Sequence, residues 1–248
     1  MVTAAVMLSV VAALAWLLWL AADIPGRIGT ARWVGLLAVA LIPVWLLLVA
    51  YYAPIEAVQG IIQKIFYVHI PAIIPTYFGF ILSAIGGGLY LFTRQERWDQ
   101  LAVSGAEVGV VFCTLMLVVG PIWAKPAWGQ WWAWDLRLTM TLILWFIYVA
   151  YLFLRSFAFG SDTARTYTAV YGIAGVCVIP FVYFALDLAQ SATMHPTNPA
   201  REGLPPEMGR TVGVGMITFI WIFAWLIAKR CEVGLLQSRV LASRVGVA

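Results

Sequence analysis

The feature that most constrains this chain is a series of seven long apolar runs, each separated from the next by a short polar stretch. A membrane-spanning helix needs about 20 predominantly apolar residues, and each run is close to that length. They cover residues 2–22, 33–52, 66–92, 105–124, 138–157, 167–188 and 211–228. With 63% hydrophobic and only 10% charged residues, the composition is far from that of a soluble domain. We therefore expect an all-α, polytopic membrane helix bundle without a separate soluble domain.

The first run, residues 2–22, resembles a signal peptide only superficially. No basic residue precedes it, and it is too long for the apolar core of such a signal. We expect it to stay in the protein as a membrane helix.

Basic residues fall in short clusters between the apolar runs and predict the orientation of the chain. Seven crossings would place ten of the 15 Lys and Arg residues on one side and five on the other. Since cytoplasmic loops carry the excess of basic residues, the N-terminus and the loops at 53–65, 125–139 and 189–210 are expected to face outward. The net charge of +4 is small and spread over these clusters, which argues against a nucleic-acid-binding surface.

Several familiar motifs are absent from the sequence. The three cysteines, Cys113, Cys177 and Cys231, lack the C-x-x-C spacing of a redox pair or zinc site, and we interpret them as small core residues. Without a G-x-x-x-x-G-K-[ST] loop the chain has no ATPase of the P-loop type. Without C-x-x-C-H it is not a c-type cytochrome of the usual kind.

Two of the outer loops have distinct patterns. Over 53–65, apolar residues recur at helical spacing and predict an amphipathic helix lying on the membrane surface. Its apolar face would hold Ile55, Val58, Ile61, Ile62, Ile65 and Phe66, and its polar face Glu56, Gln59, Gln63 and Lys64. The 189–210 loop contains four prolines and is expected to form an ordered extramembrane cap rather than one helix.

The chain has only two histidines, His69 and His195. Four predicted crossings separate them, so both are expected on the outer side. For each one alone, an interfacial histidine bonded to solvent or backbone is an equally good interpretation. Imidazole is also the common axial ligand of heme iron, and two histidines from opposite directions can hold a heme between them.

The stretch KPAWGQWWAWDLRLT, residues 125–139, places four of the 13 tryptophans within seven positions. An aromatic belt at the membrane interface is the ordinary explanation, but such a belt does not need this density. A platform of indoles suits a planar hydrophobic ligand such as a porphyrin. The platform would consist of Trp128, Trp131, Trp132 and Trp134, and the cations near it that suit propionate groups are Lys125, Arg137 and Arg201.

Three acidic residues near or inside the runs have alternative interpretations. Asp135 is either part of the ligand site or the N-cap of the helix that follows it. Asp187 either orients a ligand histidine or pairs with a nearby cation. Glu107 lies near a cytoplasmic helix end and receives no role.

The run GPIWAKPAWGQWWAWDLRLT at 120–139, with FYVHIPA at 66–72, resembles the WWD signature of a family of heme-handling membrane proteins that includes CcmC, CcmF and CcsA. Within that family the chain is most similar to the CcmC proteins, over roughly residues 50 to 230. The resemblance implies a heme b site at the outer face with His69 and His195 as axial iron ligands. It also implies a cradle formed by the WWD segment, with Trp128, Trp131, Trp132, Trp134, Asp135, Lys125 and Arg137.

The resemblance further implies a location, partners and a role. It places the protein in the bacterial inner (cytoplasmic) membrane with the heme site facing the periplasm. Its expected partners are the ABC-transporter subunits CcmA and CcmB, the small protein CcmD and the heme chaperone CcmE, to which it would deliver heme for cytochrome c maturation. It would be a transfer protein without its own ATPase rather than an enzyme.

CcmC proteins usually have six membrane helices, whereas this sequence predicts seven. We therefore expect six core transmembrane helices plus one extra. Residues 1–32 would form the extra N-terminal helix and a cytoplasmic loop, 33–230 the CcmC-like membrane domain, and 231–248 a cytoplasmic C-terminal tail.

Three other functions stay open at this point. A CcsA-like cytochrome c synthetase component would carry further histidines within the membrane. An electron-transfer cytochrome b subunit would ligate heme inside the bilayer. The third alternative is a transporter or scaffold subunit that binds no heme.

Overall fold

The computed structural model describes residues 2–157, 161–189 and 204–245, and its long elements within these ranges are all helices. Seven helical stretches are long and apolar enough to cross a membrane, which confirms the predicted all-α membrane bundle. The helices are α1 (Val2–Ala22), α2 (Ile24–Arg27), α3 (Ala31–Leu47), α4 (Phe66–Thr93), α5 (Glu96–Trp128), α6 (Leu136–Phe157), α7 (Asp162–Val176), α8 (Ile179–Tyr183), α9 (Ala185–Ala189) and α11 (Pro206–Val245). Three short 3-10 or π-helical segments lie between them: η1 (Ile28–Thr30), η2 (Leu48–Tyr52) and η3 (Ile61–Ile65).

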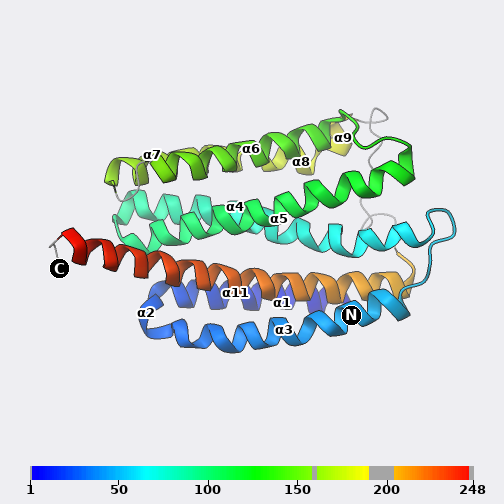
Figure 1. The fold of residues 1–248 in the computed structure, drawn as a ribbon, viewed down its shortest axis with the longest axis horizontal. Coiled ribbons are helices and arrows are strands. Elements are labelled where there is room, and N and C mark those ends of the chain that lie inside the picture. The colour runs from blue at the N-terminus through cyan, green and yellow to red at the C-terminus, as the bar shows by residue number, and fades with distance from the viewer. Residues whose placement is uncertain (1, 158–160, 190–203, 246–248) are drawn as a thin grey trace.

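The long helix α11 runs through the middle of the bundle (Figure 1). Helices α1 and α3 pack on one side of it and the α4–α5 hairpin on the other, while α6 and α7 cover the far side of that hairpin. One end of the bundle, here called the outer end after its expected orientation, carries the start of α1, the turn 53–60 and the loop 129–135. The opposite, inner end carries the α4–α5 turn and the C-terminal end of α11.

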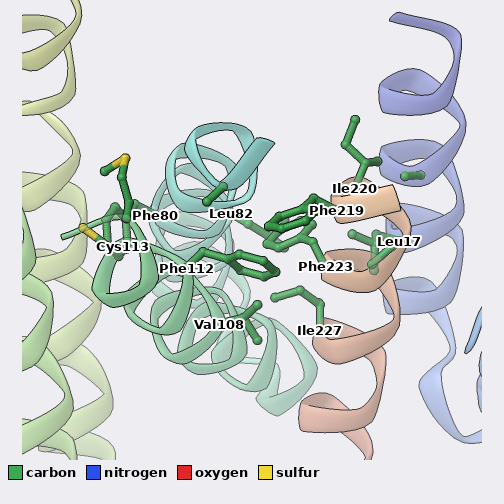
Figure 2. Close-up of a cluster of buried hydrophobic side chains, with 14 of the residues drawn as sticks. Leu17, Phe80, Leu82, Val108, Phe112, Cys113, Phe219, Ile220, Phe223 and Ile227 are labelled. Carbon is green, nitrogen blue, oxygen red and sulfur yellow. The ribbon is translucent and has the colours of Figure 1, made fainter. Parts of the chain in front are cut away.

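Aromatic side chains fill the contact between α5 and α11. The ring of Phe112 lies 5.8 Å from that of Phe219 and 6.5 Å from that of Phe223, centroid to centroid. Figure 2 shows these rings between the two helices, with Leu17 of α1 on the other side of α11. Because the N-terminal helix shares this buried core, its apolar residues pack against other helices as well as making it long enough to span a membrane.

Small residues let α4 and α5 approach closely, as they do in many membrane helix pairs. A Cβ atom on Gly79 would lie 2.8 Å from the carbonyl oxygen of Gly105, and one on Gly105 would lie 2.7 Å from that of Gly79. The hairpin is therefore a rigid base for the side chains at its outer end.

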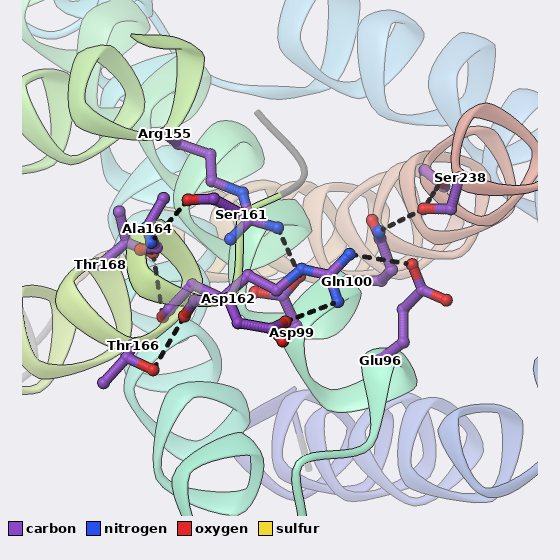
Figure 3. Close-up of polar contacts among 12 residues, drawn as sticks. Glu96, Asp99, Gln100, Arg155, Ser161, Asp162, Ala164, Thr166, Thr168 and Ser238 are labelled. Carbon is purple, nitrogen blue, oxygen red and sulfur yellow. Dashed lines mark hydrogen bonds and ion pairs between the residues drawn. The ribbon is translucent and has the colours of Figure 1, made fainter. Parts of the chain in front are cut away.

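The inner end is rich in paired charges. Buried Asp99 of α5 forms an ion pair with Arg155 of α6, and its carboxylate lies 3.5 Å from Arg165 of α7 (Figure 3). Arg165 also lies 3.3 Å from Glu96. Because a buried charge without a partner is strongly destabilising, this network ties three helices together.

Four arginines at the inner end also lie over aromatic rings, at distances of 4.5 to 5.6 Å. The pairs are Arg27 with Trp19, Arg32 with Trp33, Arg94 with Tyr90, and Arg97 with Trp98. Arginine beside an interfacial aromatic residue is the pattern expected where helices leave the bilayer on the cytoplasmic side.

The prediction of an amphipathic helix over 53–65 is wrong. Only η3 is helical there, because the Glu56 carboxylate accepts the backbone N–H groups of Val58 and Gln59 and so competes with helix formation. Gly60, at φ 64°, then reverses the chain. Gln63, expected on the polar face, is 4% exposed, whereas Val58 is 90% exposed.

Three other helices have different ends from those predicted. The apolar run 105–124 is shorter than α5, which begins at Glu96 and continues through Pro126 to Trp128. The sixth run breaks into α7, α8 and α9 near Pro180, which has no N–H for the carbonyl of Val176. Helix α11 continues through most of the expected C-terminal tail, to Val245. The proposed division at residues 32 and 230 stays a prediction.

Candidate functional site

A cavity of about 550 Å³ lies at the outer end, within the range of roughly 300–1,000 Å³ found for small-molecule sites. Helices α4, α5, α6 and α8 and the start of α11 surround it, together with the turn 53–60 and the loop 129–135. The lining is mainly apolar and aromatic. Its non-indole polar side chains are Gln59, His69, Tyr77, Arg137, Thr141 and Tyr183.

His69 lies in the first turn of α4 and contributes its imidazole to the cavity wall. A Cβ atom on Gly120 of α5 would lie 3.3 Å from Cε1 of His69 and 3.7 Å from Nδ1, so this edge of the ring lies against the α5 backbone. The indole of Trp123 meets the imidazole edge to face, with centroids 6.0 Å apart and planes at 65°.

The four tryptophans of the WWD segment separate into two pairs. Trp128, at the end of α5, and Trp132, in the following loop, line the cavity. Trp131 and Trp134 do not line it and are 59% and 78% exposed. Nε1 of Trp132 is buried and has no hydrogen-bond partner among the described residues. Two rings of the predicted four-ring platform therefore form part of the cavity wall and two do not, and the role of the platform in ligand binding stays a prediction.

The cations predicted near the ligand also differ in position. Arg137, in the first turn of α6, lines the cavity and donates from Nη2 to the carbonyl oxygen of Tyr183 at 3.3 Å. Lys125 does not line it; its Nζ donates to the carbonyl oxygen of Gly129 at 2.9 Å, at the C-terminal end of α5. The side chain of Lys125 is thus used at the end of its own helix, and its predicted pairing with a propionate stays a prediction.

Asp135 is the N-cap of α6, as one of its two interpretations predicts. Its carboxylate accepts the N–H of Leu138 at 2.9 Å, and the residue is 8% exposed. It does not line the cavity but holds the turn that carries Arg137. Asp187 lies exposed in α9 and is not part of the lining.

His195 and Arg201 lie outside the described residues. Within the described ranges, no group of three or more His, Cys, Asp or Glu side chains is placed to hold a bare metal ion. The cavity instead suits a flat apolar ligand with a metal at its centre and acidic groups at its edge. It offers one imidazole, one guanidinium, and aromatic and apolar walls.

Trp123 and Gly120 are site residues that the sequence interpretation did not single out. They were assigned to an apolar membrane run that ends at residue 124. A continuous helix would have placed Met116, Gly120, Trp123 and Ala127 on one face at spacings of four, three and four, and all four line the cavity.

Comparison with known proteins gives a consistent match. A model of the family described as heme exporter protein C (CcmC) matches residues 7–246. The heme exporter protein C of Haemophilus influenzae is 30% identical over 190 residues, which are 75% of this chain and 76% of that protein. A putative cytochrome c biosynthesis ccmC-like mitochondrial protein of Arabidopsis thaliana is 30% identical over 190 residues, 76% of this chain and 69% of that protein.

A protein with the same description from Marchantia polymorpha is 35% identical over 137 residues. That match spans 55% of this chain and 58% of the Marchantia protein, less than two thirds of its length.

Proposed function

This chain belongs to the heme exporter protein C family, and from that premise we propose that it handles heme for cytochrome c biogenesis. It binds heme b in the outer-end cavity and passes it to the heme chaperone CcmE. The observation that carries this proposal is that His69, Trp128, Trp132 and Arg137 line one cavity of about 550 Å³.

Each of these side chains has a role that suits heme. The imidazole of His69 supplies one axial ligand to the iron, and His195 supplies the other. The indoles of Trp128 and Trp132 provide apolar wall for the porphyrin. Arg137 pairs with a propionate at the porphyrin edge, because a guanidinium binds carboxylates in a bidentate way.

The setting of the site follows from the same proposal. The protein lies in the inner membrane of a bacterium with its outer end in the periplasm, and it works beside CcmA, CcmB and CcmD. Because the chain has no P-loop of its own, any nucleotide hydrolysis in such an assembly comes from a partner. A CcsA-like synthetase or a cytochrome b subunit is less well supported, since the sequence offers only two histidines and one of them, His69, lies at the outer end.

The test is to purify the protein with its partners from heme-replete cells that lack CcmE and to record the absorption spectrum. We expect a six-coordinate heme. His69→Ala should lose most of it, and added imidazole should partly restore binding by filling the vacated position. His195→Ala should behave in the same way. Because the two ligands act as a unit, the double variant His69→Ala, His195→Ala should transfer heme only slightly less well than the weaker of the two single variants.

The matched control is Ile73→Ala, which truncates a cavity side chain one turn below His69 without removing a ligand. It should keep a six-coordinate spectrum. A well-folded wild-type preparation without heme absorbance would overturn the proposed function, and a normal spectrum in His69→Ala would exclude that residue as the ligand.

A further inference from the structure

We propose that Gln59, in the outer turn, is a positioning residue for the axial ligand His69 and acts on it through the indole of Trp123. This inference rests on the proposed function, because it concerns how firmly the imidazole is presented to heme iron. It assigns a task to a residue that lies outside both sequence motifs of the site.

The first link joins the outer turn to α5. Nε1 of Trp123 donates a hydrogen bond of 2.7 Å to Oε1 of Gln59, between residues 64 positions apart. Both side chains line the cavity. A water molecule could accept the same N–H, but it would not tie the indole to a fixed part of the backbone.

Gln59 is itself held in place by its turn. Its backbone N–H is bonded to the carboxylate of Glu56, and Gly60 donates its N–H to the carbonyl oxygen of Glu56 at 2.9 Å. The positive φ of Gly60, 64°, fixes the direction in which the chain leaves this turn. The acceptor for Trp123 therefore sits on a locally well-defined support.

The second link joins Trp123 to the imidazole. The indole lies between two residues of the first turn of α4, with ring centroids 5.9 Å from Phe66 and 6.0 Å from His69. On the same face of α5, Gly120 leaves just enough room for the Nδ1–Cε1 edge of His69.

Through these two contacts, the outer turn affects how the imidazole of His69 is oriented toward the heme iron. If the indole rotates, the imidazole loses the neighbour that fixes its plane. Groups that orient a ligand histidine without touching the metal typically change metal affinity by about 10- to 100-fold when removed. Because Gln59 acts through one more side chain, we expect an effect near the lower limit, about tenfold.

The experiment compares Gln59→Leu, which keeps similar bulk but removes the acceptor, with Gln59→Glu, which keeps an acceptor oxygen. The matched control is Val58→Ala, at the neighbouring position in the same turn, where the side chain is 90% exposed. Each variant is purified with its partners. The readouts are heme affinity, the EPR spectrum of the ferric heme, its reduction potential and the melting temperature.

We expect Gln59→Leu to bind heme about tenfold more weakly and to shift the EPR spectrum and the potential, with an unchanged melting temperature. Gln59→Glu should restore the wild-type spectrum, and Val58→Ala should match the wild type. A wild-type spectrum and affinity in Gln59→Leu would overturn the inference. So would a loss of heme that merely follows a lower melting temperature and is not rescued by Gln59→Glu. Absence of heme from the wild type would instead overturn the proposed function.

A second pair of variants tests the contact with α5 independently of the outer turn. Gly120→Ala places a methyl group 3.3 Å from Cε1 of His69 and must displace the ring, whereas Gly88→Ala in α4 has no neighbour within 4 Å. We expect only Gly120→Ala to alter the EPR spectrum. Identical spectra from the two variants would overturn the proposed seat of the imidazole on α5.

Discussion

At the scale of single residues, exposure and position separate the tryptophans of the WWD segment into two pairs. Trp132 contributes a half-buried indole to the cavity wall, whereas Trp134, two positions later, is 78% exposed and contacts it edge to face with centroids 5.9 Å apart. An exposed indole at the outer end of a membrane bundle suits the lipid interface. The dense run of tryptophans therefore combines two rings of the cavity wall with two exposed rings.

This division predicts different losses of heme from two otherwise similar variants. Trp132→Ala should lower heme affinity, because an aromatic contact contributes about 1 kcal/mol beyond its buried area. That energy corresponds to roughly a fivefold weaker affinity. Trp134→Ala should retain heme nearly as the wild type does. Heme titration followed by absorbance measures both, and equal losses would assign the segment a general packing role instead.

The sequence predicted the types of side chain in the cavity better than it predicted which residues contact them. Two imidazoles, four indoles and nearby cations were expected around the ligand. Of these, His69, Trp128, Trp132 and Arg137 line one cavity. Lys125 could not be excluded from the sequence, since its position depends on where α5 ends. Gln59 could not be found at all, because its partner Trp123 is distant in sequence and hydropathy assigns that tryptophan to lipid.

At the scale of elements, the caps of helices decide how the site is presented. Asp135 fixes the first turn of α6 by accepting the N–H of Leu138, and that turn carries Arg137 into the cavity wall. Ser161 fixes α7 in the same way, accepting the N–H of Ala164 at 3.1 Å, but α7 begins at the inner end. The two caps therefore offer a matched comparison.

Asp135→Ala and Ser161→Ala should each lower the free energy of unfolding by about 1 kcal/mol. In a chain of this length that is a fall of about 2–4 °C in melting temperature. Only Asp135→Ala should also weaken heme binding, and Asp135→Ser should restore both properties because serine is an equally good N-cap. Thermal unfolding and heme titration provide the measurements. A loss of heme in Asp135→Ser would mean that the carboxylate itself acts on the ligand.

Hydropathy located the seven membrane-length helices of the described residues but misplaced several of their ends, for identifiable physical reasons. Charged residues conceal the first part of α5, because Asp99 is buried through its pairing with Arg155 and Arg165 and so interrupts the apolar run. Within the outer turn, the Glu56 side chain replaces helical hydrogen bonds. Such pairings depend on three-dimensional neighbours, which a one-dimensional average of hydropathy does not contain.

At the scale of the whole molecule, the cavity is confined to the outer end by the core beneath it. Toward the inner end, Phe80 and Tyr148 stack with centroids 3.8 Å apart and planes at 11°. The hydroxyl of Tyr148 lies 3.2 Å from the carbonyl oxygen of Phe80 and 2.9 Å from that of Gly172, which joins α6 to α4 and α7. A ligand of this cavity is therefore expected to enter and leave at the outer end.

The orientation of the bundle decides in which compartment that exchange occurs. Seven crossings place the two ends of the chain on opposite sides, and the inner end carries the basic clusters and the four arginine–aromatic pairs. The positive-inside rule then predicts that the inner end faces the cytoplasm and the cavity faces outward. Single cysteines at the two ends can test this assignment directly.

In a Cys177→Ser background, which removes the one exposed native cysteine among the described residues, Val58→Cys marks the outer end and Gln237→Cys the inner end. A membrane-impermeant maleimide should label Val58→Cys in spheroplasts and Gln237→Cys only after lysis. The buried Cys113 and Cys231 should stay unlabelled in the folded protein, so the background alone is the control. The reverse pattern would turn the cavity toward the cytoplasm, where it could not load a periplasmic heme chaperone.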